Sequence, residues 1–231
     1  MSGAKQNIYG LLKFGEKQHI ESLRNEGLLY MKPLADFSKL ESDMARGDAF
    51  EGATRIIQPK HVGELIFDFP PMGKFTANPS DLAGPLQIGL HKTAACNVYC
   101  MFAVTKPVDG ELVDRQNFQF GDACVLVLNP TEFLSRVVGA AKNAGLSYLE
   151  YRLVEYYDAK DYSGEVGRFR KRSIFAYQNE FRIVVEPGSD TPRKLFAGSL
   201  LDITSEILSL SEVNQHLDFS TRSAREAGLS W

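Results

Sequence analysis

The sequence predicts an α+β fold, a curved or split mixed β-sheet core with flanking helices, in a single domain over residues 1–231. Short apolar runs typical of β-strands recur along the chain and are separated by Pro, Gly and Asn. Few segments show the apolar spacing of a helix. With 44% hydrophobic and 24% charged residues, the composition is that of a packed globular protein.

The N-terminal part predicts alternating strands and helices. Ile20 and Leu23 stand at helical spacing, and Gly27 follows where a helix C-cap belongs. Pro33 ends the next extended run. The expected elements are a strand, a helix, a strand and a short helix over residues 8–14, 16–26, 28–31 and 34–40.

Residues 54–105 are rich in strand signals. Pro-Pro, Asn-Pro and Gly-Pro pairs separate the apolar runs, so the strands are short. Several short strands in succession indicate a curled or two-layered sheet. We expect them over residues 55–58, 63–69, 86–90 and 97–105.

The second half predicts a helix between strands. Pro130 opens the helical pattern, which reaches Ala144 and stops at Gly145. A polar, basic and aromatic connector over 158–177 precedes the later strands. The remaining expected elements are strands over 123–128, 149–157, 180–185 and 193–196, a helix starting near Asp202, and a docked helix in the tail, 211–231.

Composition narrows the class of protein. The formal net charge of −3 gives no global basic footprint for nucleic acid. Cys96, Cys100 and Cys124 are an odd number without Cys-x-x-Cys spacing, which predicts buried thiols in a reducing compartment and no metal site. No signal peptide and no apolar window of roughly 18 residues is present, so we expect a cytoplasmic protein without a membrane partner.

The strongest candidate for chemistry is the stretch Tyr-Gln-Asn-Glu-Phe-Arg at 177–182. Alternate residues of a strand share a face, so Gln178, Glu180 and Arg182 should lie opposite an apolar set that begins at Phe181. This places Gln178 and Glu180 side by side at the mouth of a strand, in a geometry that suits a ligand cleft. The alternative is an exposed strand with a Glu180–Arg182 surface pair.

The stretch resembles the Gln-x-Glu or Glu-x-Glu segment of ADP-ribosyltransferases, in which a loop leads into an apolar strand. The resemblance implies an ADP-ribosyltransferase-like fold and NAD as substrate, with Glu180 contacting the nicotinamide ribose and Gln178 orienting the acceptor. A preorganised carboxylate stabilises the positive charge that the sugar develops when nicotinamide leaves. A neutral Gln beside it adds no second negative charge to raise the pKa of Glu180.

The resemblance also implies residues that bind NAD. Members of the Arg-Ser-Glu type of that family carry an Arg on an early strand and a Ser-Thr-Ser strand midway; the nearest residues here are Tyr9 or Lys13, and Thr105. Arg172 or Arg168 is available for the diphosphate. Arg46 and Asp48 could hold a phosphate or ribose, although a structural turn capped by Asp48 is the alternative.

A second resemblance covers most of residues 8–185. The order of motifs, with Arg-Gly-Asp-Ala-Phe-Glu-Gly at 46–52 and Tyr-Gln-Asn-Glu-Phe-Arg at 177–182, is similar to a broad bacterial family of uncharacterised proteins. Members show an Asn-Asp-Pro-Phe-Glu-like loop and a late Glu-x-Glu-Tyr-Arg strand. This pattern implies one continuous fold.

The expected function is transfer of ADP-ribose from NAD to a protein or nucleic-acid acceptor, as a bacterial toxin or phage-defence effector would do. One alternative is a non-catalytic module in which the basic and aromatic segment 168–175, which begins with the dense cationic run at 168–172, binds nucleic acid or a nucleotide. Such a run can equally be a solvated face. A further alternative is a metal-dependent nuclease built on Asp48, Glu51 and Glu180.

Overall fold

The computed structural model describes residues 7–39, 48–89, 96–105 and 111–216. The chain divides into two compact units, and the class is α+β, as predicted. Unit 1 consists of Met1–Pro33, Cys96–Val154 and Ala176–Trp231, and unit 2 consists of Leu34–Ala95 and Glu155–Phe175. That the two units unfold together, as the single domain expected from the sequence would, stays a prediction.

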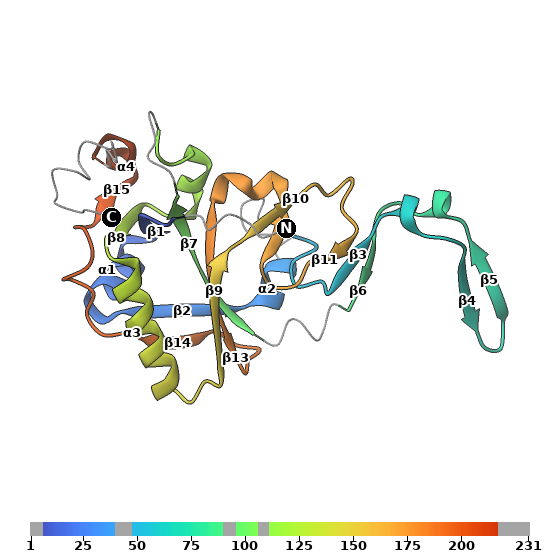
Figure 1. Ribbon diagram of the computed structural model, residues 1–231, viewed down its shortest axis with the longest axis horizontal. Coiled ribbons are helices and arrows are strands. Elements are labelled where there is room, and N and C mark those ends of the chain that lie inside the picture. Colours follow the sequence, from blue (N-terminus) through green and yellow to red (C-terminus); the bar gives the residue numbers. More distant parts are fainter. Residues whose placement is uncertain (1–6, 40–47, 90–95, 106–110, 217–231) are drawn as a thin grey trace. The chain divides into compact units, whose positions relative to one another are not determined.

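Unit 1 is built on an eight-stranded sheet (Figure 1). The order is β14-β2-β7-β1-β8-β15, and β13 lies between β7 and β9. Every pairing in this sheet is antiparallel, whereas a mixed sheet was expected. The strands are β1 (Gly10–Gly15), β2 (Leu28–Pro33), β7 (Asn97–Val104), β8 (Ala123–Val127), β9 (Tyr148–Leu153), β13 (Glu180–Glu186), β14 (Arg193–Phe196) and β15 (Leu208–Ser209).

Two amphipathic helices pack on one face of this sheet. Helix α1 (Lys17–Glu26) buries Ile20 and Leu23 and ends at Gly27, whose φ of 64° is left-handed. Helix α3 (Pro130–Asn143) starts with Pro at its first position, and the Asn129 side chain accepts the Glu132 N–H at 3.0 Å. Its buried residues, Phe133, Val137 and Ala141, recur every four positions. Both helices agree with the prediction to within two residues.

The sheet is covered on both faces. Phe181, Ile183 and Val185 join the cluster under α1 and α3, so their prediction as the core face is confirmed. The opposite face, which was expected to open on a cleft, is buried as well. On this side of the sheet, the other strands, residues near the short 3₁₀ helix η3 (Arg115–Phe120) and helix α4 (Leu210–His216) form a second cluster: Leu12, Phe14, Phe102, Val104, Leu112, Val113, Cys124, Leu126 and Val213.

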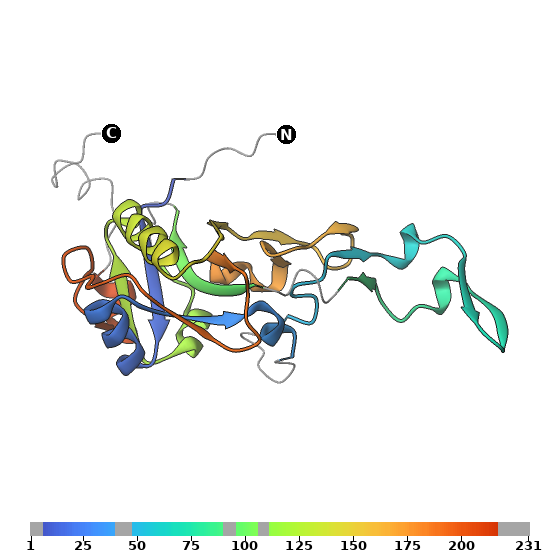
Figure 2. The ribbon, with the colours of Figure 1, turned by 90° about the horizontal axis from the view of Figure 1, so that it is seen from below.

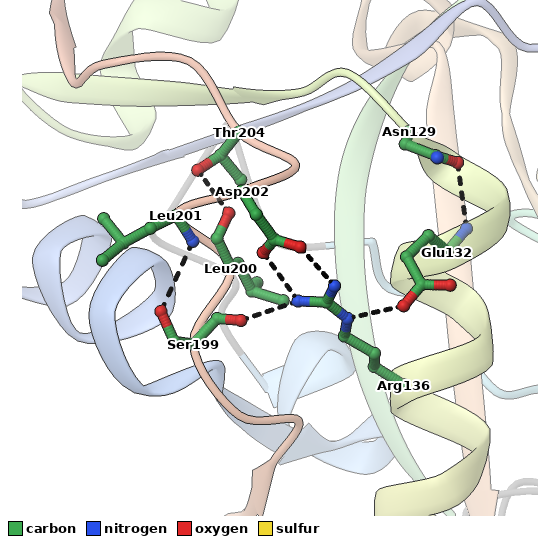
Figure 3. A network of polar contacts seen from close by, with 8 residues as sticks. All are labelled: Asn129, Glu132, Arg136, Ser199, Leu200, Leu201, Asp202 and Thr204. Atoms are coloured by element: carbon green, nitrogen blue, oxygen red, sulfur yellow. Dashed lines mark hydrogen bonds and ion pairs between the residues drawn. The ribbon is translucent and has the colours of Figure 1, made fainter.

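The helix predicted near Asp202 is absent; a turn stands there and α4 begins later, at Leu210. Figure 3 shows how Arg136 of α3 holds this turn. Its guanidinium donates to both carboxylate oxygens of Asp202, at 2.8 and 2.5 Å, and to the Ser199 carbonyl at 2.8 Å. Its Nε donates to Glu132 at 2.8 Å. The turn is therefore tied to α3 instead of continuing as a helix.

This network predicts a pH dependence. The hydrogen bond from Arg136 lowers the pKa of Asp202 below its ordinary value. The carboxylate therefore stabilises the fold above the unfolded pKa of about 3.9, and that stabilisation is lost as pH falls through the lower folded pKa. We expect Asp202→Asn to lower the melting temperature slightly at pH 7, with the difference from wild type shrinking as pH falls below about 3.9. Glu111→Gln, at the local Glu111–Arg115 pair, is the control and should change less at either pH.

Unit 2 contains helix α2 (Leu34–Lys39) and three small sheets. Its apolar cluster consists of Ala53, Ile56, Tyr157 and Val166. The predicted strand over 149–157 is broken at Val154, and its second part is β10 in unit 2. Strands β11 (Gly164–Glu165), β3 (Arg55–Ile57) and β6 (Leu86–Ile88) form one antiparallel sheet, β10 (Glu155–Tyr157) and β12 (Arg170–Arg172) pair in parallel, and β4 (Leu65–Phe69) and β5 (Gly73–Ala77) form a hairpin.

Short 3₁₀ helices punctuate the strands of unit 2. Helices η1 (Pro59–His61) and η2 (Pro79–Asp81) flank the β4–β5 hairpin. Helix η4 (Ser173–Gln178) follows β12 and leads into β13 of unit 1. Figures 1 and 2 both show the hairpin at the end of unit 2 beyond its three-stranded sheet.

Candidate active site

A glutamate and an arginine are buried together on β13. Arg182 Nε donates to Glu180 Oε1 at 2.7 Å, and the two side chains are only 2% and 5% exposed. The alternative predicted from the sequence, a Glu180–Arg182 pair on the surface, is therefore right about the two partners and wrong about their exposure. β13 lies between two strands, and Glu180 faces Phe102 across the pairing with β7.

Burying such a pair of charges is unfavourable in free energy. Removing two charges from water can cost more than their attraction returns, so apolar residues would stabilise the same position at least as well. Buried titratable groups with a specific charge partner are concentrated at functional sites. The Glu180–Arg182 pair is therefore the strongest candidate for chemistry in unit 1.

The residue before Glu180 has an unusual backbone. Asn179 has a φ of 35°, the left-handed region that residues other than Gly seldom adopt. Its carbonyl accepts the Ala103 N–H at 2.8 Å, and its side-chain amide donates to the Ala103 carbonyl and, at 3.1 Å, to Thr105 Oγ1. These bonds fix the turn into β13 against the end of β7. Strained backbone that the surroundings hold in place is common at functional sites.

Gln178 does not share the strand geometry predicted for it. It ends η4, so the alternation that pairs it with Glu180 stops at Asn179. Its amide Nε2 lies 3.3 Å from the Tyr177 hydroxyl, which also accepts from Gln119 at 3.1 Å. Asn117, buried on η3, donates to the Tyr177 carbonyl at 2.8 Å. We call Thr105, Tyr177, Gln178, Asn179 and Glu180 the β13 entry cluster.

The residues predicted to bind NAD are divided by the fold. The Tyr9 N–H donates to the Val104 carbonyl at 2.8 Å, which places Tyr9 at the same end of the sheet as Thr105 and the β13 entry cluster. Lys13 lies opposite Val125 and donates to the Cys100 carbonyl at 2.7 Å, over the Tyr99 ring. Val125 and Tyr99 belong to the cluster under α1 and α3, so Lys13 is on the other face from Glu180.

Asp48 and Arg172 lie in unit 2 and bind each other. Asp48 is buried, and it accepts from Arg172 Nε at 2.7 Å, from the Arg172 N–H at 3.2 Å and from the Phe50 N–H at 3.1 Å. This is the structural cap that the sequence left as the alternative to a ribose or phosphate ligand. The Arg172 guanidinium lies 5.4 Å from the rings of both Phe50 and Phe175. Arg46 lies outside the described residues.

The cationic run at 168–172 is not a uniformly solvated face. The Lys171 side chain is 5% exposed and lies 4.0 Å from the fully buried Glu51 carboxylate. Arg170 donates to Glu155 at 2.9 Å. The contacts of this run with Glu51 and Glu155 were not predicted from the sequence, because only the pairing of β10 with β12 and the fold of the 48–52 loop bring these carboxylates to it.

A pocket in unit 2 was also missed. It has a volume of about 460 Å³ and opens beside β10, lined by Tyr156, Tyr157, Tyr162, Glu155 and Arg170 among others. The Tyr157 hydroxyl is buried, and burial raises its pKa. The sequence predicted one continuous strand over 149–157. Such a strand does not bring Tyr162 and Arg170 together with the residues of β10.

Two further properties concern metals and membranes. Among the described residues, no group of three or more His, Cys, Asp or Glu side chains could hold a metal ion, and Asp48 and Glu51 lie in a different unit from Glu180. No described helix is long and apolar enough to cross a membrane. None of the three cysteines forms a disulfide; Cys96 and Cys124 are buried as predicted, whereas Cys100 is partly exposed. Burial raises the pKa of the Cys124 thiol to about 12.

No family model, curated protein or solved structure matches this chain. The geometry of unit 1 is therefore the basis for assigning chemistry. It presents a carboxylate oriented by an arginine, with amide, hydroxyl and phenol groups at the adjoining end of the sheet. These groups can hold a polar ligand by hydrogen bonds and can stabilise a developing positive charge.

Proposed function

We propose that unit 1 is an ADP-ribosyltransferase-like enzyme that uses NAD as substrate, with Glu180 as its catalytic carboxylate. The observation that carries the proposal is the buried Glu180–Arg182 pair at the start of a central strand. In a buried site the carboxylate acts through a low dielectric, which strengthens its attraction to an oxocarbenium-like ribose. The Arg182 bond orients the carboxylate before substrate binds.

The reaction breaks the bond between the ribose anomeric carbon and nicotinamide. Nicotinamide leaves with the electron pair, a nucleophile of the acceptor bonds to the anomeric carbon, and the nucleophile's proton passes to solvent. Water in place of the acceptor gives hydrolysis of NAD. Because Glu180 is nearly buried, binding of NAD must open the start of β13.

The order of the strands supports the assignment. The resemblance implies functional positions on an early strand, a middle strand and the strand with the glutamate; Tyr9, Thr105 and Glu180 lie at one end of the consecutive strands β1, β7 and β13. Gln178, at that end, would orient the acceptor, a protein or a nucleic acid. A toxin or phage-defence effector fits such a reaction. We assign no role to Lys13, Asp48 or Arg172, because Lys13 lies on the opposite face and the other two bind each other in unit 2.

The experiment measures release of nicotinamide from NAD and labelling of protein, RNA and DNA with ADP-ribose. We expect Glu180→Gln to reduce both by at least about 10²-fold, the usual effect of removing one preorganised electrostatic contact. Glu186→Gln, at the far end of the same strand, is the matched control and should retain activity. Absence of NAD turnover in the wild type with all acceptors contradicts the proposal.

Further variants separate chemistry from folding. Glu180→Asp keeps the charge but withdraws the carboxylate, so activity should fall while the far-ultraviolet circular dichroism spectrum stays that of the wild type. Gln178→Ala should lose transfer to the acceptor and keep hydrolysis of NAD. If Glu180→Gln folds and turns over NAD at the wild-type rate, Glu180 is not the catalytic carboxylate.

A further inference from the structure

Asn179 extends the pairing of β13 with β7 by one residue, and it does so partly through its side chain. The register sets Glu180 opposite Phe102, so the next pair along the ladder is Asn179 and Ala103. In alternate pairs of an antiparallel ladder, the two residues exchange both main-chain N–H···O bonds. Here the Ala103 N–H donates to the Asn179 carbonyl at 2.8 Å, but the Asn179 N–H donates to the Ala176 carbonyl at 3.1 Å. The side-chain amide of Asn179 donates to the Ala103 carbonyl in its place.

The position suits asparagine better than any other residue that its backbone admits. The left-handed φ of 35° is adopted most readily by Gly, and next by Asn and Asp. Of these three, Asn is the one with a side-chain N–H. A carbonyl oxygen can only accept, so the amide nitrogen of Asn179 must face Ala103. Its second N–H donates to Thr105 Oγ1 at 3.1 Å, so both amide protons are bonded.

These bonds lie directly beside the candidate carboxylate. Ala103 is fully buried, so loss of the amide would take a donor from a carbonyl that water does not reach, which is unfavourable. On the other side of β13, the Val154 N–H donates to the Glu180 carbonyl at 2.8 Å. Glu180 is the first residue of β13, and its carboxylate accepts from Arg182 Nε at 2.7 Å. The bonds of Asn179 therefore fix the end of the strand from which this carboxylate projects.

We propose that Asn179 is the positioning residue of Glu180. Its side chain sets where β13 begins, and it thereby holds the Glu180 carboxylate where Arg182 binds it. A displacement of about 1 Å can reduce the rate of an enzyme about 10²-fold, so a residue that touches no substrate can still limit turnover. This role in turnover rests on the proposed function, whereas the positioning of Glu180 does not depend on it.

Two substitutions remove the bond to Ala103 and keep the backbone. Asn179→Gly adopts the left-handed φ without a side chain, and Asn179→Asp keeps the shape but has no N–H to donate. Asn214→Asp is the matched control. The Asn214 amide also donates to a main-chain carbonyl of unit 1, that of Val113 at 2.9 Å, and Asn214 lies on α4 instead of β13.

The first measurement is the exchange of the Arg182 Nε–H with solvent, followed by NMR. We expect both Asn179 variants to speed this exchange at least about tenfold, because the start of β13 opens without the bond. Asn214→Asp should stay within about twofold of the wild type. The main-chain N–H of Ile183, in the middle of β13, should keep its wild-type rate in every variant, which identifies the opening as local and the protein as folded.

The second measurement is the steady-state release of nicotinamide from NAD. We expect both Asn179 variants to lower kcat about 10- to 100-fold, because the Glu180 carboxylate is less well oriented. KM should not rise, since the start of β13, which NAD must open, opens more readily. Asn214→Asp should keep the wild-type kcat. A role in folding alone would lower kcat only as far as the protection of Ile183 is lost.

The two measurements separate the outcomes. Exchange of the Arg182 Nε–H at the wild-type rate in both Asn179 variants overturns the positioning of Glu180, whether or not the chain turns over NAD. Faster exchange with unchanged kcat, in a wild type that releases nicotinamide, overturns the role of Asn179 in turnover. A wild type without NAD turnover contradicts the proposed function, and the exchange rate then still decides whether Asn179 holds Glu180.

Discussion

Replacing Arg182 with methionine should lower the free energy of unfolding by about 3–5 kcal/mol, because it leaves the Glu180 carboxylate buried without its guanidinium. Arg182 is 2% exposed and occupies the middle of β13, where neighbouring strands pair on both sides. Methionine fills a similar volume, so loss of charge dominates over loss of packing. Urea-induced unfolding followed by circular dichroism measures the change.

Two further variants identify the cause. The double variant Glu180→Met, Arg182→Met removes both charges and should be more stable than Arg182→Met alone. Arg152→Met changes the cross-strand neighbour of Arg182 on β9, an arginine that is 46% exposed and bonded to Glu150, and should cost less than about 1 kcal/mol. If the double variant is no more stable than the single one, the buried carboxylate is not the source of the loss.

The sequence predicted best the elements whose signals are local. Helix α3 has Pro130 at its first position and a buried residue every fourth position, and α1 ends at Gly27. Strand β14 occupies the predicted residues 193–196. In each case the residues that start, stop or orient the element lie within it or beside it, so a single sequence contains the information.

The errors arise where distant segments decide the structure. The turn at 201–204, where a helix was predicted, is held by Arg136, more than 60 residues earlier. The parallel pairing of β10 with β12 divides the strand predicted over 149–157. Neither partner can be identified from local periodicity, since period and propensity say nothing about which segments pair.

The candidate site shows the same limit. Alternation along β13 correctly separated Phe181 from Glu180, because the period of a strand is fixed by its backbone. It could not reveal that Glu180 is buried, since burial depends on segments that are distant in the sequence: Phe102, its cross-strand neighbour on β7, lies 78 positions earlier. Lys171 was assigned to a basic surface for the same reason, because its buried partner Glu51 is 120 positions earlier.

Gly27→Ala should destabilise the fold by about 3 kcal/mol or more, through two effects that add. Gly27 has a left-handed φ of 64°, which adds roughly 1–2 kcal/mol for a residue with a Cβ. A Cβ there would also lie 2.1 Å from the Gly198 carbonyl oxygen, and the backbone must shift to relieve this overlap. The shift is resisted because Ala197 N–H bonds the Gly27 carbonyl at 2.9 Å, next to the pairing of β14 with β2.

Gly145→Ala separates the two effects. Gly145 comes directly after Ala144, the C-cap of α3, and has a φ of 71° similar to that of Gly27, but no atom lies within 4 Å of its added Cβ. This variant should therefore show the conformational effect alone, about 1–2 kcal/mol. Thermal and urea unfolding of both variants measures the difference. Equal losses would mean that the approach of residue 198 to the end of α1 is not tight, whereas a larger loss for Gly27→Ala shows that close packing of backbone on backbone makes glycine necessary there.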